Sequence, residues 1–125
     1  MSLIQGLTLL IIRVKDLDRE VAFYRDGLGM DLTRQVEGRV AQFSIPMCGT
    51  LELTSGGEIV PPVKDRREVQ KLPIFRVANV HDVVERATHH GATVVNEPFE
   101  FNGQWLAYLA DPEGHVFGIS TVMAA

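Results

Sequence analysis

Apolar residues follow two periodicities along the first half of the chain. A β-branched and leucine-rich run at residues 7–14 predicts a strand, and Asp16 or Asp18 then offers a helix cap. The next apolar residues recur at intervals of four, three and four: Leu17, Val21, Tyr24 and Leu28. This spacing predicts a helix with one apolar face, ended by Gly27 and Gly29. Short turns then separate three predicted strands, near residues 32–36, 39–45 and 50–54.

The second half of the chain repeats this order. Residues 72–77 predict a strand, and Asn79 stands where Asp16 did, as a cap. An apolar helical stripe follows and ends at Gly91, and its members are Val80, Val83, Val84 and Ala87. Three more strands are predicted, near residues 93–95, 104–110 and 116–121. The last two are joined by Asp-Pro-Glu-Gly at 111–114, a turn sequence with proline at its second position.

Direct comparison of the two halves gives an internal repeat. Residues 9–18 align with residues 72–81, and residues 46–53 align with residues 112–119. The repeat is too long for a solenoid unit and too short for two ordinary domains. It predicts one α+β domain, residues 1–125, of two strand-helix-strand-strand-strand modules. Their predicted bounds are 4–54 for module one, 55–71 for a connector and 72–122 for module two.

Composition narrows the kinds of partner. The net charge of -4, with Lys and Arg scattered along the chain, argues against a nucleic-acid surface. The longest apolar run, residues 7–12, is too short to span a bilayer, and no signal peptide is visible. Cys48 is the single cysteine and is interpreted as a structural thiol, which fits a reducing cytoplasm. We therefore expect a cytoplasmic protein with no membrane or nucleic-acid partner.

The repeated module also carries family motifs. The first is D-L-D-R-E-V-A-F-Y-R-D-G-L-G at residues 16–29, and the second is D-P-E-G-H-V-F-G-I at residues 111–119. With the βαβββ order, they resemble the vicinal oxygen chelate superfamily, which includes glyoxalase I, extradiol dioxygenases, fosfomycin-resistance enzymes and bleomycin-resistance binding proteins. The resemblance implies a curved eight-stranded sheet cleft for a small organic molecule. It also implies a homodimer.

Members of that superfamily that use a metal take ligands from the first and last strands of each module, commonly His or Gln and Glu. The equivalent positions here are Leu9, Glu52, Leu72 and Gly118. Only Glu52 is a donor, and one carboxylate does not hold a transition metal. The histidines are interpreted as helix-end or turn residues: His81, His89, His90 and His115. We therefore predict no metal and no cofactor, with a divalent metal as the alternative.

The resemblance and strand alternation together predict which residues bind the ligand. If Leu9 faces the cleft, Ile11 and Arg13 share its face, and the same holds for the repeat. The predicted ligand-binding residues are Leu9, Ile11, Arg13, Glu52, Leu72, Ile74, Arg76, Trp105, Tyr108 and Gly118. Residues of the opposite parity are predicted to be core: Leu51, Leu53, Phe117 and Ile119.

Several of these roles have an alternative. The arginines either bind the ligand or reach solvent, and one of them pairs with Glu52 in the interpretation that we favour for this carboxylate. Trp105 is either a rim aromatic or a core residue. Gln42 is the repeat partner of Ala107 or Tyr108. Two further aromatic residues are candidates for the mouth of the cleft, Phe99 and Phe101. The connector is interpreted as a linker, with a lid or an oligomer contact as alternatives.

The sequence is compatible with three candidate functions. The first is a metal-independent small-molecule binding protein of the bleomycin-resistance kind, because the residues supply an apolar cleft with a few polar anchors. The second is a glyoxalase- or dioxygenase-like enzyme, with or without a divalent metal, in which Glu52 is a general base whose pKa is raised by an apolar pocket. The third is a dimerisation or regulatory module.

Overall fold

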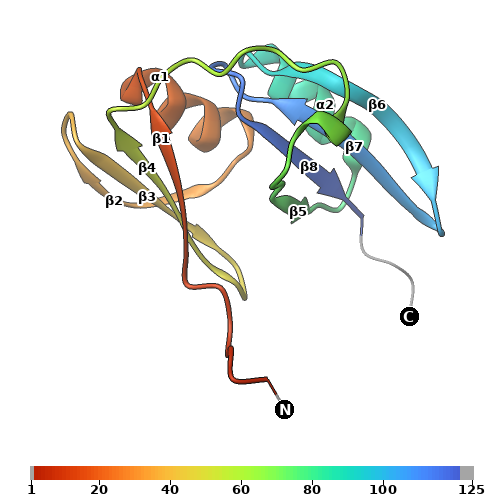
Figure 1. The fold of residues 1–125 in the computed structure, drawn as a ribbon, viewed down its shortest axis with the longest axis horizontal. Coiled ribbons are helices and arrows are strands. Elements are labelled where there is room, and N and C mark those ends of the chain that lie inside the picture. Colours follow the sequence, from red (N-terminus) through yellow and green to blue (C-terminus); the bar gives the residue numbers. More distant parts are fainter. Residues whose placement is uncertain (1, 122–125) are drawn as a thin grey trace. The chain divides into compact units, whose positions relative to one another are not determined.

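The computed structural model describes residues 2–121 (Figure 1). Met1 and residues 122–125, which include the predicted end of module two, lie outside the described residues. Contacts within the chain divide it into two units, the first ending at Ile59 and the second beginning at Val60. Each unit contains one module of the predicted repeat.

The first unit has the predicted βαβββ order, with one addition after its helix. Its elements are β1 (Leu9–Val14), α1 (Leu17–Ala22), the π-helix η1 (Phe23–Gly27), β2 (Asp31–Val36), β3 (Val40–Ile45) and β4 (Gly49–Ser55). The sheet order is β1-β4-β3-β2, in which β1 and β4 are parallel and the other pairs are antiparallel.

The second unit repeats this topology. Its elements are the 3₁₀-helix η2 (Arg66–Glu68), β5 (Ile74–Arg76), α2 (Val80–His89), β6 (Thr93–Phe101), β7 (Gln104–Ala110) and β8 (Val116–Ser120). The sheet order is β5-β8-β7-β6, with β5 parallel to β8. The predicted α+β fold of two βαβββ modules is confirmed, and the eight strands form two four-stranded sheets, one in each unit.

Both α-helices begin at the predicted capping position. The Oδ1 atom of Asp16, not that of Asp18, accepts a hydrogen bond from the Arg19 amide at 3.1 Å. The Oδ1 atom of Asn79 accepts one from the Asp82 amide at 3.0 Å. Each cap satisfies an amide that has no partner within its own helix.

The first helix departs from the expected regular α-helix after Ala22. Residues 23–27 form a π-helix, in which the Leu28 amide donates to the Phe23 carbonyl at 3.1 Å. This wider turn buries the consecutive rings of Phe23 and Tyr24 together, and they meet edge to face with centroids 5.2 Å apart. Spacing alone cannot reveal such an insertion, because a π-turn changes the period only locally.

The predicted alternation of core residues is confirmed in both sheets. Leu51, Leu53, Phe117 and Ile119 are all buried. At the equivalent place in the two modules, the phenylalanine and the leucine of a cross-strand pair have changed strands. Phe43 pairs in register with Leu51, whereas Leu109 pairs with Phe117 at the equivalent place.

Two strand boundaries in module two differ from the prediction. β5 has only three residues, so Leu72 lies before the strand, and Pro73 has no amide hydrogen with which to extend it. β6 continues to Phe101 instead of ending at residue 95, with register shifts on both sides of Asn96. Pro98 is tolerated inside β6 because it falls in the second irregularity.

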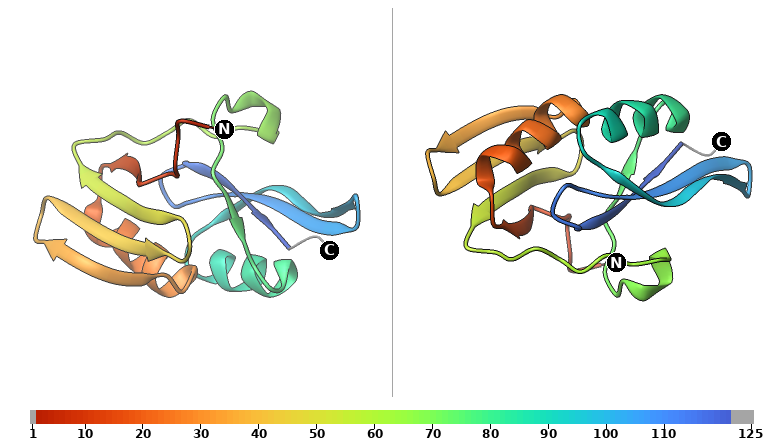
Figure 2. Two further views of the ribbon diagram at one scale, coloured as in Figure 1. Left: turned by 90° about the horizontal axis from the view of Figure 1, so that it is seen from below. Right: turned by 90° about the horizontal axis from the view of Figure 1, so that it is seen from above.

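The segment predicted as a linker is structured over much of its length. The Val60 amide donates to the Glu113 carbonyl at 2.8 Å, in the β7–β8 turn. Asp65 and Glu68 then form a capping box around η2. The Arg66 amide donates to Asn96 Oδ1 on β6 at 3.0 Å. Residues 60–68, here called the strap, therefore fold onto module two, and Figure 2 shows η2 and α2 on opposite sides of its sheet.

Candidate functional site

The predicted ligand-binding residues of module one lie on the outward face of its sheet. Leu9 is 38% exposed and Ile11 45% exposed, whereas Val14 is buried. Arg13 is also exposed. In register, one row of side chains crosses the sheet from β1 to β2: Ile11, Glu52, Gln42 and Arg34. In this row the carboxylate of Glu52 lies between the exposed side chain of Ile11 and the side-chain amide of Gln42.

Two neighbouring side chains hold the half-buried Glu52 carboxylate. Gln42 Nε2 donates to Oε1 at 2.7 Å, and Thr54 Oγ1 donates to Oε2 at 2.9 Å. Within residues 2–121 no arginine lies within ion-pair distance of Glu52, so the favoured interpretation of a structural ion pair is wrong. Neutral donors satisfy the carboxylate instead.

These hydrogen bonds set the protonation state of Glu52. Donation from Gln42, followed by that from Thr54, lowers the pKa of Glu52 below its usual value, and the charges of Arg34 and Arg13 add to the effect. The alternative in which Glu52 is a general base required a raised pKa, and the lowered pKa of Glu52 is in the opposite direction. Glu52 is ionised at neutral pH and serves as a fixed acceptor.

Glu52→Gln is expected to lower the free energy of unfolding at neutral pH, and to have a smaller effect at acid pH. Because the pKa is lowered in the folded chain from its usual 4.5, the ionised carboxylate stabilises the fold above about pH 4.5, and this contribution is lost as pH falls through the folded-state pKa. The difference in free energy of unfolding between the wild type and the variant should therefore shrink below pH 4.5. Urea unfolding at several pH values measures it.

The control for this prediction is Glu37→Gln, in the exposed turn after β2, with an expected effect below about 0.5 kcal/mol at every pH. A ¹³C titration of the Glu52 carboxyl group gives the same answer directly. A midpoint at or above 4.5 would contradict the hydrogen-bonded arrangement.

In module two, the equivalent row replaces the carboxylate with an aromatic ring. The row contains Ile74, Gly118, Tyr108 and Asn96. Tyr108 therefore corresponds to Gln42, which decides between the two partners that the sequence left open. A Cβ atom at Gly118 would lie 2.8 Å from Cε1 of the Tyr108 ring and 3.1 Å from Cγ1 of Ile74. The tyrosine ring thus covers the position at which module one carries Glu52.

Two aromatic rings and an arginine form a cluster on this outward face. Phe99 and Tyr108 lie nearly parallel, with centroids 6.3 Å apart and planes inclined by 19°. The guanidinium carbon of Arg66, from the strap, lies 5.0 Å from each centroid. In this arrangement the positive charge of the guanidinium group is attracted to the negative faces of both rings.

The other predicted residues of module two are not all brought together. Ile74 is 49% exposed and Arg76 is exposed, both on the outward face, and Leu72 precedes β5. Trp105 has the opposite parity to Tyr108 and meets His81 of α2 edge to face, with ring centroids 4.8 Å apart. It is thus placed on the helix side of the sheet. Phe99 joins Tyr108, whereas Phe101 is 61% exposed near the end of β6.

Sequence reasoning missed Arg66 and Asn96. Asn96 receives the Arg66 amide and donates to Asp65 Oδ2 at 3.3 Å, so it fastens the strap to β6. The signal available in the sequence was Asp65-Arg-Arg-Glu68, which has the spacing of a capping box. Its presence in a polar segment predicts a short helix there, but not the surface against which the helix packs.

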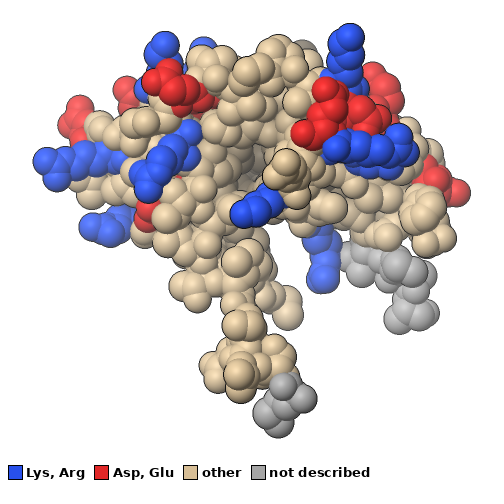
Figure 3. Space-filling model, viewed as in Figure 1, with Lys and Arg blue, Asp and Glu red and all other residues tan. Residues whose placement is uncertain are grey.

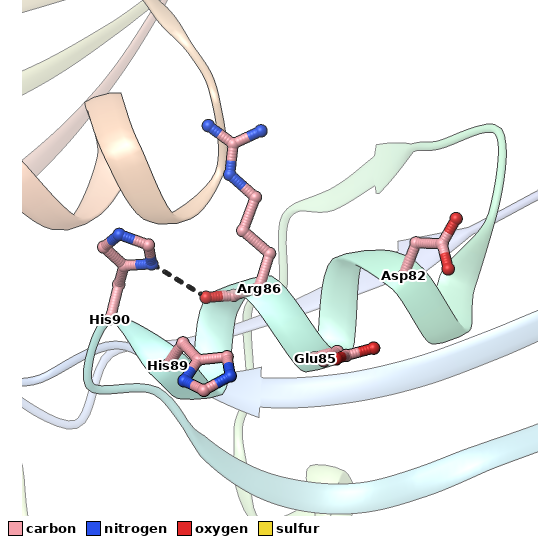
Figure 4. A pocket seen from close by; sticks show the side chains of 5 residues that line it. All are labelled: Asp82, Glu85, Arg86, His89 and His90. Carbon is pink, nitrogen blue, oxygen red and sulfur yellow. Dashed lines mark hydrogen bonds between the residues drawn. The ribbon is translucent and has the colours of Figure 1, made fainter.

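A shallow hollow of ≈ 370 Å³ lies along α2 and is lined by Asp82, Glu85, Arg86, His89 and His90 (Figure 4). All five residues come from this one helix or its cap, and His90 Nδ1 lies 2.9 Å from the Arg86 carbonyl oxygen. The fourth histidine, His115, is half-buried in the β7–β8 turn as expected, with its amide bonded to Asp111 Oδ1 at 3.0 Å. The hollow offers side chains from only one direction and does not enclose a ligand.

Charged side chains form no single-sign stripe on the face drawn in Figure 3, where Lys and Arg are interspersed with Asp and Glu. This agrees with the distribution of charge along the sequence. No helix within residues 2–121 is long and apolar enough to cross a membrane.

Comparison with known proteins decides the family. The model of the Glyoxalase/Bleomycin resistance protein/Dioxygenase superfamily matches residues 6–119. The chain belongs to this superfamily. The resemblance inferred from the βαβββ repeat and its two motifs is therefore confirmed.

Individual members of the superfamily are related to the chain more distantly. A lactoylglutathione lyase from Salmonella typhimurium is 28% identical over 115 residues, which cover 84% of this chain and 84% of that protein. A glyoxalase-related enzyme from Fulvimarina pelagi has a TM-score of 0.76 at 17% identity, over 95% of this chain and 89% of that one. For a fosfomycin resistance protein from Mesorhizobium loti the score is 0.75 at 17% identity, over 97% and 95%. These two structures share the superfamily fold.

The donor set of this superfamily member does not fit a metal at the four strand positions discussed above. Leu9 and Leu72 have no lone pair to offer, and the space beside Gly118 is filled by the Tyr108 ring. Within residues 2–121 no three His, Cys, Asp or Glu side chains are grouped closely enough to hold a metal ion. Glu52 is left as a single donor, engaged by Gln42 and Thr54.

Proposed function

We propose that this superfamily member is a metal-independent binding protein for a small organic molecule. The observation that carries the proposal is the Tyr108 ring lying over Gly118. The position that would supply a second carboxylate is instead filled by the edge of an aromatic ring, and Tyr108 itself is only 6% exposed. Binding sites for organic molecules combine apolar area with a few oriented polar groups, and the outward faces of both sheets have that composition.

The outward face of each sheet offers its own kind of contact to a ligand. In module one, the exposed side chains of Leu9 and Ile11 supply apolar area, and Glu52 supplies an ionised acceptor. In module two, Ile74 supplies apolar area beside the ring of Tyr108. None of these contacts needs a proton transfer, so binding without turnover accounts for the residues present.

A second candidate function is a glyoxalase-like lyase, supported by the 28% identity to a lactoylglutathione lyase. It would require Glu52 to act as a base, with or without a divalent metal. The lowered pKa makes the carboxylate a weaker base at neutral pH, because the best catalytic bases have pKa values near the operating pH. We therefore rank the lyase below the binding protein.

A thermal-shift screen of organic compounds, repeated with EDTA, tests the proposal. At least one compound is expected to raise Tm by the same amount with and without EDTA, because a ligand that binds only the folded chain stabilises it. A rise in Tm produced by Ni²⁺, Zn²⁺, Mn²⁺ or Fe²⁺, or a compound shift abolished by EDTA, would contradict metal independence. Turnover lost in Glu52→Gln while binding survives would establish the lyase instead.

The homodimer and the cytoplasmic location, expected from the resemblance and from Cys48, belong to the same proposal. Light scattering at micromolar concentration measures the oligomeric state. A monomer that still binds the compound from the screen would separate ligand binding from dimerisation.

A further inference from the structure

We propose that Arg66 recognises an anion on the outward face of the module-two sheet, beside Phe99 and Tyr108. The ligand that we infer for this place is a small organic carboxylate with an apolar body. The inference deepens the proposed function and rests on it. It arises from the strap, which lies outside the four strand positions considered above and which sequence reasoning interpreted as a linker.

The guanidinium group of Arg66 is held by two rings and makes no ion pair in the described part of the chain, although its positive charge helps to lower the pKa of the neighbouring Asp65. It lies 5.0 Å from the centroids of both Phe99 and Tyr108. Within residues 2–121 it donates no side-chain hydrogen bond and has no carboxylate within ion-pair distance. Its planar fork of N–H donors therefore stays available, and such a fork matches the two oxygens of a carboxylate.

Hydrogen bonds of the strap fix the backbone at Arg66, and the two rings position its side chain. The Arg66 amide is bonded to Asn96, and the carboxylates on either side of Arg66 are occupied by backbone amides. Asp65 accepts from the Arg67 amide at 2.8 Å, and Glu68 accepts from the Asp65 amide at 2.9 Å. A side chain fixed in this way loses little conformational entropy when it binds a ligand, which favours affinity.

The strap is also anchored at its other end. A Cβ atom on Gly114 would collide with the carbonyl oxygen of Val60, so only glycine admits this approach. Gly114 has φ +96°, and the adjacent Glu113 carbonyl accepts the Val60 amide at 2.8 Å. The strap is thus fastened to the β7–β8 turn and to β6, with Arg66 next to the second attachment.

The charges on the strands beside Arg66 favour an anion, and the carboxylate of Asp65, on the strap, is occupied by the Arg67 amide and by Asn96. Arg76 is exposed on the same face and shares a row with Ser120, Leu106 and Phe99. This row and the row of Ile74 contain no carboxylate. Leu106 and the half-exposed Ile74 supply apolar area for the body of the ligand. A cationic ligand would have to displace Arg66 from both rings.

Benzoate, its neutral analogue benzamide and the cation benzamidine are the probes for this site. NMR of ¹⁵N-labelled protein follows the Nε–Hε signal of Arg66 during each titration. Benzoate at millimolar concentration is expected to shift this signal, and benzamide is not. The indole signal of Trp105, on the other side of the sheet, is the internal reference.

Arg66→Gln is expected to weaken benzoate binding roughly tenfold or more, because charge-assisted hydrogen bonds are lost. Arg67→Gln, with the same change of charge on the next residue of η2, is the matched control and should stay within about twofold, the effect of screened charge alone. Arg66→Lys retains the charge without the fork and should be intermediate. Unchanged NMR spectra away from the strap show that each variant is folded.

Three results with the benzoate series would overturn the proposal, and a fourth comes from the thermal-shift screen. The first is an Arg66 signal that does not move with benzoate. The second is equal loss of benzoate affinity in Arg66→Gln and Arg67→Gln. The third is benzamidine binding that becomes tighter in Arg66→Gln, which would make Arg66 the occupant of a cation site. A screening compound that stabilises the wild type and Arg66→Gln equally would remove Arg66 from recognition and leave the binding-protein proposal standing.

Discussion

Phe43→Ala is expected to lower the free energy of unfolding by about 3–5 kcal/mol, the usual cost of deleting a fully buried aromatic side chain. Phe43 is 0% exposed, and its ring contacts that of Tyr24 in η1, with centroids 6.3 Å apart. Removal of the ring leaves a cavity between β3 and the π-helix that the sheet cannot collapse to fill. Urea unfolding followed by circular dichroism measures the loss.

Two further variants make this prediction specific. Val36→Ala, at an exposed position of the same sheet, should change the free energy of unfolding by less than about 0.5 kcal/mol. The double variant Phe43→Leu with Leu51→Phe copies the pair Leu109 and Phe117 of module two. Because the total volume is conserved, it should cost less than the sum of its single substitutions. If the changes in free energy of unfolding of the two single variants simply add in the double variant, the pair in module one does not pack in the way of the pair in module two.

Gly118→Ala is expected to lower the free energy of unfolding by about 1–3 kcal/mol, through overpacking beneath the Tyr108 ring. The added Cβ atom would stand 2.8 Å from that ring, which is closer than van der Waals contact permits. The ring would have to move away from its place over β8. Urea unfolding reports the loss of stability, and the NMR signals of the Tyr108 ring report the movement.

The control for Gly118 is Gly6→Ala, because a Cβ atom there meets nothing within 4 Å. Tyr108→Leu should reduce the cost of Gly118→Ala by removing the clashing ring edge. Gly118→Glu should cost more than Gly118→Ala, and Tyr108→Gln in the same chain should recover part of the loss by copying the pair Gln42 and Glu52. Equal costs with and without the tyrosine would contradict the assigned contact.

Much of the fold could be predicted because its signals are local and occur twice. Asp16 and Asn79 cap their helices as expected, and Leu51 and Ile119 are buried as their parity requires. Each of these outcomes depends on the nearest few residues and on the twofold alternation of a strand. The duplication strengthened the prediction, because each module provided a template for the other.

The candidate site was less predictable, because it depends on contacts between segments far apart in the sequence. The charge state of Glu52 follows from Gln42, ten residues away on the neighbouring strand. Alternation put Trp105 and Tyr108 on opposite faces, but only the contact with His81 assigned the tryptophan to the helix side. Arg66 gave no periodic signal, and a single residue in a polar segment has none to give.

By itself, the sequence determined the two βαβββ modules, the parity of their strands and the lack of donors at three of the four metal positions. Those properties follow from residue type and spacing alone. Only the tertiary structure decided what replaces the missing donors: the Tyr108 ring over Gly118, and Arg66 of the strap on Phe99 and Tyr108. The reason is physical, since a ring or a guanidinium group takes its place from the packing of neighbouring strands and loops, which hydrophobic periodicity does not encode.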